Sequence, residues 1–244
     1  MNMRLALRDL HLSYGADDVL RGVDLCLPAG GLVGLVGPNG SGKSSLMRAC
    51  AGLVPCTGHL AIDGIDPRKE PVRARTRFGY ATDPGALPGA LRGRQCLELV
   101  AGVRQQGADA VAQAVAVADV LGLSPWLERE VVEYSLGTRQ KLAVVLALLG
   151  NPPLLLLDEV LNGLDPLAAF HLKTLLRQRA DAGATVLLAT HGLDVAERVL
   201  DRAVLLLDGR IAADWNRAEL ERLRASDGGL EAAVVERLRA RAGG

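Results

Sequence analysis

The sequence has few cysteines, histidines and aromatic side chains, and no excess of charge. The four cysteines, Cys26, Cys50, Cys56 and Cys96, form no CxxC pair, and the four histidines do not cluster. This spacing argues against a zinc site or a disulfide framework and favours free thiols in a reducing cytosol. Lys and Arg together number 28, as do Asp and Glu. The net positive charge of nonspecific nucleic-acid binders is therefore missing, so no nucleic-acid partner is expected, and we interpret the basic stretch 68–77 as a solvated loop.

Long apolar runs are also missing. No run approaches the about 18 residues that a membrane-spanning helix needs, and residues 1–9 lack the apolar stretch of a signal peptide. We therefore expect a cytoplasmic chain. Hydrophobic residues make up 49% of its 244 residues, which is enough to fill a substantial core.

Residues 37–44 match every fixed position of the phosphate-binding loop GxxxxGK[ST]. Glycines let the backbone turn so that successive N–H groups point inward, and the helix that follows offers its positive end to an anion. Lys43 can reach the β- and γ-phosphates, while the hydroxyl of Ser44 can ligate Mg²⁺. The predicted nucleotide-binding residues here are Gly37, Pro38, Asn39, Gly40, Ser41, Gly42, Lys43, Ser44 and Ser45.

Hydrophobic periodicity predicts the elements around this loop. Strands are expected over 4–13, 19–27, 31–36, 59–62, 77–82, 154–157, 184–190, 203–207 and 210–213, and helices over 44–52, 93–103, 108–123, 140–149 and 166–182. The sequence therefore predicts an α/β P-loop NTPase with a mixed core sheet, an N-terminal antiparallel β subdomain and an α-helical subdomain inserted at about 84–140. This domain is expected to span 1–215, followed by a charged helical tail over 216–244.

Two acidic residues follow the buried strand 154–157. Ligands bind at the carboxyl ends of parallel strands in open α/β sheets, so Asp158 and Glu159 fit a Walker B element. Asp158 is predicted to hold Mg²⁺, directly or through water, and Glu159 to polarise the attacking water. Taken alone, solvated acids at a strand end are nearly as good an interpretation, and the upstream phosphate loop favours the functional one.

A serine and a glycine stand just before this strand, in Tyr134-Ser135-Leu136-Gly137-Thr138, and open an apolar helix. The phosphate loop, an insertion of roughly 90 residues, this Ser-x-Gly signature, the Walker B pair and Thr190-His191 follow one another in that order. The order resembles that of the ATP-binding subunit of ABC transporters, and the resemblance spans residues 4 to about 213.

The resemblance implies further roles. Tyr14 matches the aromatic residue that stacks on adenine, and a ring beside a glycine suits that use. Ser135, Gly137 and Thr138 match signature positions that contact the γ-phosphate bound by the opposite subunit, and 162–165 matches the loop that crosses the dimer interface. His191 matches the switch histidine at the γ-phosphate, so Lys43, Glu159 and His191 form the implied catalytic set.

The chain departs from the family pattern at three places, one of which, Val160-Leu161 where Pro-Thr-like pairs are common, is expected to be tolerated in packing. Asp83 stands where the family usually has glutamine; it keeps an oxygen for Mg²⁺, so the predicted metal ligands are Ser44, Asp83 and Asp158. The signature is Tyr-Ser-Leu-Gly-Thr and not Leu-Ser-Gly-Gly-Gln. This motif resembles that of the subfamily serving simple exporters of lipids, peptides or drugs.

The resemblance thus implies an ATPase that binds ATP and Mg²⁺ and forms a homodimer or a heterodimer. It also implies a membrane-spanning permease that inserts a short helix near 83–95, which places the chain on the inner face of the cell membrane. A non-transport ATPase acting on DNA ends or ribosomes, and a non-catalytic nucleotide-binding regulator, remain alternatives. A P-loop kinase explains neither the signature nor Asp165.

Overall fold

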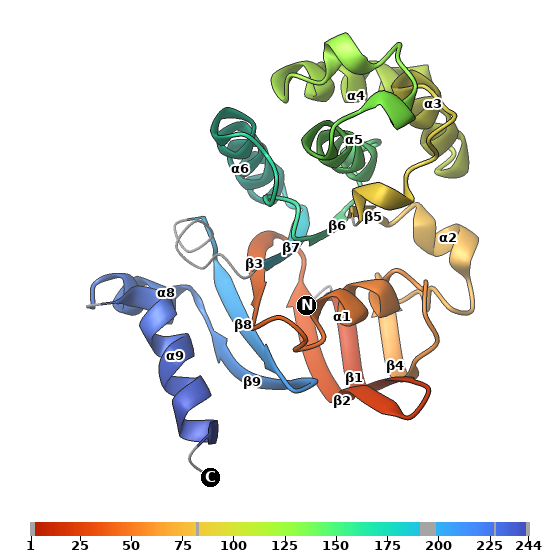
Figure 1. The fold of residues 1–244 in the computed structure, drawn as a ribbon. Helices are drawn as coiled ribbons and strands as arrows, with labels where there is room; N and C mark the ends of the chain where they lie inside the picture. The colour runs from red at the N-terminus through yellow and green to blue at the C-terminus, as the bar shows by residue number, and fades with distance from the viewer. Residues whose placement is uncertain (1–2, 82, 191–198, 227, 243–244) are drawn as a thin grey trace.

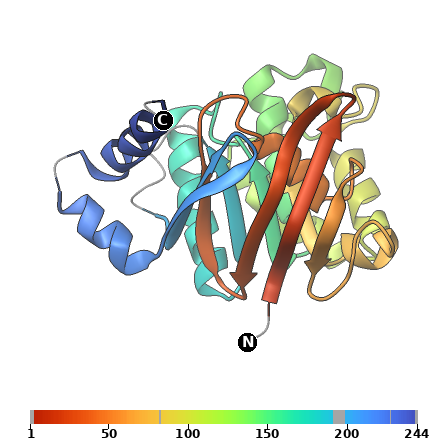
Figure 2. The same ribbon diagram turned by 90° about the horizontal axis from the view of Figure 1, so that it is seen from below.

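The computed structural model describes residues 3–242, except 82, 191–198 and 227. The N-terminal strands β1 (Met3–Tyr14) and β2 (Asp17–Pro28) form a hairpin, and β4 (Thr57–Ile62) pairs with the other edge of β1. The order is β2-β1-β4 and both pairings are antiparallel, which confirms the predicted antiparallel subdomain. Figure 2 shows this sheet from below, in front of the rest of the molecule.

The core sheet contains six strands in the order β5-β6-β7-β3-β8-β9. The first five are parallel and β9 is antiparallel to β8, so the sheet is mixed as predicted. The strands are β3 (Gly31–Val36), β5 (Phe78–Ala81), β6 (Leu154–Asp158), β7 (Thr185–Thr190), β8 (Arg202–Leu207) and β9 (Arg210–Trp215).

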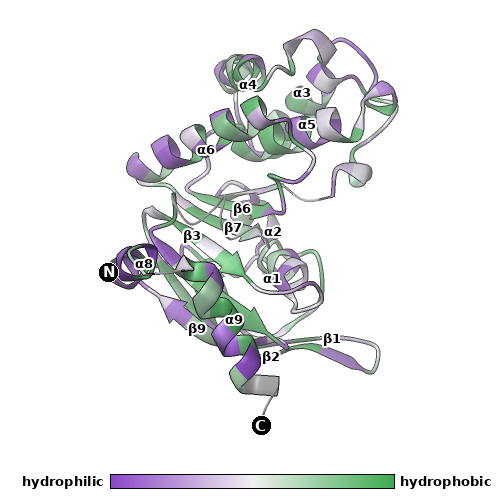
Figure 3. Cartoon of the chain, turned by 60° about the vertical axis from the view of Figure 1, so that its left-hand side comes forward, coloured by the Kyte–Doolittle hydropathy of each residue, from purple (hydrophilic) through white to green (hydrophobic). Residues whose placement is uncertain are grey.

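Consecutive side chains of a strand point to opposite sides of a sheet, and both sides of the core sheet are covered by other elements. In β6, Leu154 and Leu156 pack with α1 (Lys43–Cys50) and the antiparallel sheet. Leu155 and Leu157 pack on the other side, with the helices of the insertion and α6 (Pro166–Asp181). Figure 3 shows the central strands largely in the hydrophobic colour, with hydrophilic residues gathered on outer segments such as α8.

The insertion consists of α3 (Gly93–Val103), α4 (Ala108–Val120) and α5 (Leu136–Leu148), which lie together above β5 and β6 in Figure 1. A short 3₁₀ turn at Pro84–Ala86 precedes α3, and two more, at Ser124–Trp126 and Val131–Glu133, lie between α4 and α5. The helix predicted at 140–149 begins four residues earlier, because the side chain of Ser135 caps it by accepting a hydrogen bond from the Thr138 N–H.

The stretch 68–77, interpreted as a solvated loop, contains the short helix α2 (Pro71–Arg75), so that prediction was wrong in part. Proline at its first position and the burial of Ala74 account for this turn of helix. The tail forms α8 (Arg217–Arg224) and α9 (Gly229–Ala242), which bury Leu220, Leu230 and Val234. Among the described residues, none of the helices combines the length and apolar character that crossing a membrane requires.

Candidate nucleotide-binding site

The phosphate-binding loop lies between the end of β3 and the start of α1. Glycine is required at position 37, because a Cβ there would lie 2.3 Å from the carbonyl oxygen of Leu206. Gly42, directly before α1, has a φ of 105°, which side chains rarely adopt. Its left-handed conformation turns the chain into the helix, and the first N–H groups of α1 face the loop.

The loop encloses a cavity of about 350 Å³. Its lining residues are Val19, Asn39, Gly40, Gly42, Lys43, Ser44, Ser45 and Glu159. Ser41 is only 4% exposed, and its Oγ has no hydrogen-bond partner among the described residues. A buried hydroxyl without a partner, next to a helix N-terminus, fits a site that is completed by an anion.

Lys43 holds a positive charge inside this loop. Its side chain is 6% exposed, and Nζ donates to the carbonyl oxygens of Gly37 at 2.7 Å and Pro38 at 3.1 Å. Burial lowers the pKa of Lys43, while the charges of Glu159, 3.9 Å from Nζ, and Asp158 act in the opposite direction. The ammonium group therefore bonds to the loop itself, in the place where a polyphosphate would supply better partners.

The two acids that follow β6 lie next to this lysine. Asp158 is level with Ala189 of β7, and the Glu159 N–H donates to the Ala189 carbonyl at 3.0 Å. Burial raises the pKa of Asp158, a hydrogen bond from Ser44 lowers it, and the charge of Glu159 raises it again. Glu159 has a φ of 51°, and its Oε2 accepts a hydrogen bond from Asn162 at 3.1 Å. A strained backbone at a strand end is a common property of functional residues.

A second cavity, of about 420 Å³, adjoins the first and shares Ser44 and Glu159 with it. Its lining residues are Ser44, Arg48, Asp83, Pro84, Leu136, Gln140, Asp158, Glu159, Asn162 and Gly163. The cavity thus brings together all three predicted metal ligands. The carboxylate of Asp83 accepts a hydrogen bond from the Gly85 N–H at 2.7 Å.

These oxygen donors fit Mg²⁺. The ion prefers oxygen ligands and is usually held by one or two carboxylates together with substrate phosphates and water. Oδ1 of Asp158 is buried and has no hydrogen-bond partner among the described residues. Within the described ranges no three His, Cys, Asp or Glu side chains converge on one point, so Mg²⁺ here would also need Ser44 and phosphate oxygens.

The signature residues lie at the exposed N-terminus of α5. Ser135 is exposed and lines neither cavity, whereas Leu136, 67% exposed, reaches the second one. A Cβ on Gly137 would lie 2.7 Å from the Gly163 carbonyl, and Lys141 forms an ion pair with Asp165 at 2.7 Å. The start of α5 is therefore held against the loop 162–165, while Ser135 stays exposed and its Oγ bonds to the N–H and hydroxyl of Thr138.

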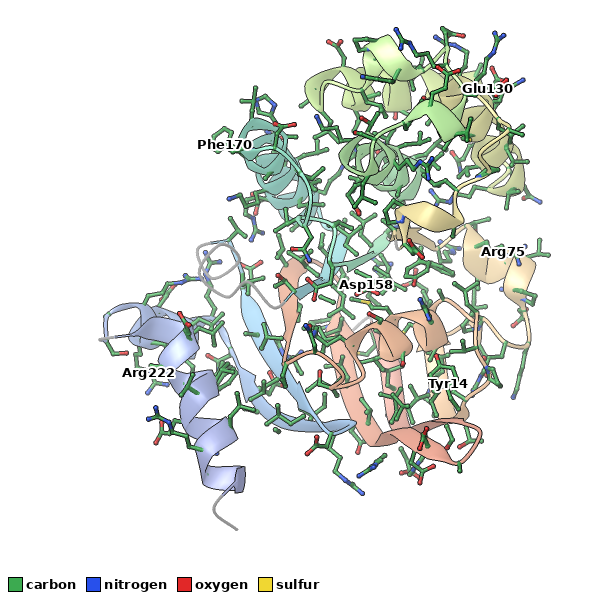
Figure 4. All side chains as sticks on the ribbon, viewed as in Figure 1. Tyr14, Arg75, Glu130, Asp158, Phe170 and Arg222 are labelled. Atoms are coloured by element: carbon green, nitrogen blue, oxygen red, sulfur yellow. The ribbon has the colours of Figure 1, made fainter. Side chains whose placement is uncertain are left out.

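Tyr14 lies at the end of β1, 44% exposed, and lines neither cavity (Figure 4). It is linked to the site through Arg48, which lines the second cavity. Burial lowers the pKa of Arg48, but hydrogen bonds with Tyr80 and Tyr14 outweigh this and raise it. His191 lies outside the described residues.

Sequence reasoning missed Arg48 and Gln140 as site residues. Arg48 stands four positions after the predicted ligand Ser44, and Gln140 stands four positions after Leu136 of the signature. Residues four apart lie on the same face of a helix, so this spacing was the available signal.

A phosphate-binding loop, a following helix and a Walker B acid pair at the carboxyl edge of a parallel sheet define a P-loop NTPase. The family model described as "ABC transporter" matches residues 20–162. The chain belongs to this family, as an ATP-binding and ATP-hydrolysing subunit that energises an ABC transporter.

The relatives include a drug-resistance protein and an import protein. The daunorubicin/doxorubicin resistance ATP-binding protein DrrA of Streptomyces peucetius is 34% identical over 212 residues, 85% of this chain and 64% of DrrA. The chain thus spans slightly less than two thirds of that relative. The aliphatic sulfonates import ATP-binding protein SsuB of Rhodopseudomonas palustris is 38% identical over 214 residues, 87% of this chain and 74% of SsuB.

Solved structures show the same fold. The ATP-binding subunit of an ABC transporter superposes with a TM-score of 0.88 at 31% identity, covering 96% of this chain and 99% of that one. The dimeric bacterial ABC transporter cassette MJ0796 gives a TM-score of 0.80 at 25% identity, covering 87% of this chain and 98% of that one. This related cassette is dimeric.

Proposed function

We propose that this chain is the ATPase of an exporter and that Mg²⁺·ATP binds across the two cavities described above. The observation that carries the proposal is the convergence of Lys43, Ser44, Asp158 and Glu159 on adjoining cavities beside a helix N-terminus. One cation, a hydroxyl and two carboxylates are the groups that phosphoryl transfer requires.

Each residue has a defined task in this proposal. Lys43 leaves the Gly37 and Pro38 carbonyls to bind the β- and γ-phosphates, and Ser44 with Asp158 and Asp83 holds Mg²⁺. When bound, Mg²⁺ neutralises the charge that develops on the transferred phosphoryl group. Glu159 orients the attacking water from the neighbouring position. The roles of Tyr14 at the adenine and His191 at the γ-phosphate stay predictions.

Turnover by Glu159→Gln tests the catalytic assignment. The variant keeps the size of the side chain but loses its basic carboxylate, so ATP hydrolysis should fall by about 10²–10⁴-fold while ATP binding persists. Glu231→Gln, on the tail helix α9, is the matched control and should hydrolyse ATP at the wild-type rate. Equal, near-zero rates for wild type and Glu159→Gln would contradict catalysis and support a nucleotide-binding regulator.

A second copy, or a related subunit, completes the site in this proposal. Ser135 is exposed and does not line its own chain's phosphate cavity, so within one chain the signature hydroxyl cannot contact the phosphates in the described conformation. The dimeric relative supports an arrangement in which Ser135, Gly137 and Thr138 face the partner's nucleotide. ATP-dependent dimerisation of Glu159→Gln, measured by light scattering, should disappear in the double variant that also carries Ser135→Arg.

The groove for the permease is proposed at a third cavity, of about 180 Å³, between β5 and the inserted helices. Its lining residues are Tyr80, Ala81, Asp83, Ala86, Leu87, Val100, Arg104, Ala143 and Leu146. Apolar side chains around a concave surface suit the apolar face of a short helix. Asp83 lines this groove and also the cavity of Asp158, which supports a link between the two.

Co-purification with a co-expressed candidate permease tests the groove. Leu87→Asp should abolish capture, because it places a charge on the apolar surface. Leu99→Asp, at an exposed leucine of α3 that does not line the groove, is the matched control and should leave capture intact. Equal capture by both variants would place the permease elsewhere.

Export, as opposed to import, is supported by the Tyr-Ser-Leu-Gly-Thr signature and by the similarity to DrrA. The proposal places the chain on the inner face of the cell membrane, attached through its permease, with 1–215 as the ATP-binding domain and 216–244 as a tail. Inside-out membrane vesicles containing both proteins should accumulate substrate when ATP is added outside. Accumulation only by right-side-out vesicles loaded with ATP would indicate import.

A further inference from the structure

Gln140 is a buried polar side chain in the second cavity that none of the assigned roles uses. Only 6% of the residue is exposed, and its side-chain Nε2 has no hydrogen-bond partner among the described residues. A buried amide donor without a partner is destabilising, so its presence here needs an explanation. Because Gln140 lines the cavity of the metal ligands, the missing acceptor is to be sought there.

Asp158 offers the complementary atom. Its Oδ1 is also buried and also lacks a partner within the described ranges, and Asp158 lines the same cavity. The unpaired atom of Gln140 is a hydrogen-bond donor, and the unpaired atom of Asp158 is an acceptor. Two other acids line this cavity: Asp83 is exposed and already accepts from the Gly85 N–H, and Glu159 already accepts from Asn162, so both gain less from an amide donor.

The fold brings these two side chains to the same level. Helix α5 ends at Leu148, and β6 starts at Leu154 and returns alongside the helix. Gln140 lies about 12 Å back along the helix from Leu148, at about 1.5 Å per residue. Asp158 lies about 13 Å along the strand from Leu154, at about 3.3 Å per residue. The short connection thus sets Gln140 beside the end of β6.

We propose that Gln140 is a positioning residue of the metal site: when Mg²⁺·nucleotide is bound, its Nε2 donates a hydrogen bond to Oδ1 of Asp158. The bond fixes the carboxylate in the orientation that the metal needs, as partners of metal ligands commonly do. This inference rests on the proposed function, in which Asp158 holds Mg²⁺. It also explains why a residue of the inserted helix faces the Walker B strand.

Binding of a fluorescent ADP analogue, measured with saturating Mg²⁺ and again in EDTA, tests this role without any turnover. Gln140→Met keeps the length of the side chain but removes the donor, and should weaken binding in Mg²⁺ by about tenfold. Binding in EDTA should not change. Gln140→Glu places a carboxylate opposite Asp158 and should weaken Mg²⁺-dependent binding further. Gln178→Met and Gln178→Glu, at an exposed glutamine of α6, should bind like wild type in both conditions.

Several results would overturn the proposal. Unchanged Mg²⁺-dependent binding in Gln140→Met does so, and an equal loss in Mg²⁺ and in EDTA shows a merely structural role, which thermal melting of the variant would reveal independently. In an Asp83→Asn background, Gln140→Met should still weaken Mg²⁺-dependent ADP binding about tenfold. If this loss disappears, Asp83 and not Asp158 is the acceptor. Wild-type protein that binds ADP equally with and without Mg²⁺ overturns the proposed metal site itself.

Discussion

Gly79, in β5, controls how closely the inserted helices approach the core sheet. A Cβ at this position would lie 1.9 Å from the carbonyl oxygen of Ala147 in α5 and 3.0 Å from Cγ of Pro152. The nearest obstacle is backbone, so no side-chain rotation can relieve the contact. In Gly79→Ala, β5 and α5 must therefore move apart.

The size of the movement sets the expected loss of stability. Contacts of a Cβ below 3.0 Å essentially do not occur, so the two elements must separate by about 1 Å. Most of α5 is buried, and overpacking a close-packed interior costs typically about 1–3 kcal/mol. We expect a value near 3 kcal/mol, because the helix must shift as a body. For a chain of this size that corresponds to a Tm lower by about 6–12 °C.

Thermal melting followed by circular dichroism measures this loss, with Gly102→Ala as the control. Gly102 lies in α3 and has nothing within 4 Å of a built Cβ, so alanine should raise the Tm slightly by favouring the helix. ATP hydrolysis by Gly79→Ala should also fall, since α5 carries the signature and displacements of about 1 Å can cost about 10²-fold in rate. A Gly79→Ala protein that melts like wild type would refute the close packing of α5 on β5.

Two further predictions concern single side chains. Tyr14→Ala should weaken ATP binding by about 5–150-fold and Tyr14→Phe by much less, because stacking on a base is worth about 1–3 kcal/mol and needs only the ring; equal losses in nucleotide titrations would exclude stacking. Burial alone would raise the pKa of Asp201, but hydrogen bonds from Arg177 (2.7 Å) and the Leu32 N–H (2.8 Å) outweigh it and lower the pKa. The stability that this carboxylate contributes is therefore complete above about pH 4 and is lost as the pH falls through its lower folded-state pKa. The free energy of unfolding, measured by urea titration, should therefore fall more steeply below pH 4 for wild type than for Asp201→Asn.

Much of the fold was predictable because its signals are local. The buried run before Gly37 and the acids after Leu157 each fix an element and its end within a few residues. The apolar pattern places the start of α5 at 140, four residues too late, although the Ser-x-Gly signature marks its true beginning, where Ser135 caps the helix. Helix α2 was missed because the arginines around Pro71 suggested a solvated loop.

The site was predictable only where one motif contributes it. Lys43 and Ser44 belong to one loop, and the acids to one strand end, so sequence order sufficed. Gln140 shares a cavity with Asp158 only because the chain reverses direction after Leu148 and returns as β6 alongside α5. The four-residue spacing sets Gln140 on the same face of α5 as Leu136, but it does not encode the alignment of that face with β6. Arg48 lines this cavity because it lies one turn after Ser44 on α1, and the sequence does not encode the direction in which that helix points.

Helix α5 connects three places that the proposed function treats separately. Its N-terminus carries the exposed signature serine, and Gln140, one turn further, lines the cavity of Asp158. At its C-terminus, Arg104 donates to the carbonyl oxygens of Leu146, Ala147 and Leu149 at 2.7–3.2 Å, and Arg104 also lines the proposed permease groove. Because the hydrogen-bonded turns of a helix move together, a segment that displaces Arg104 would also displace the signature. A single helix of 13 residues can thus link the groove to the nucleotide.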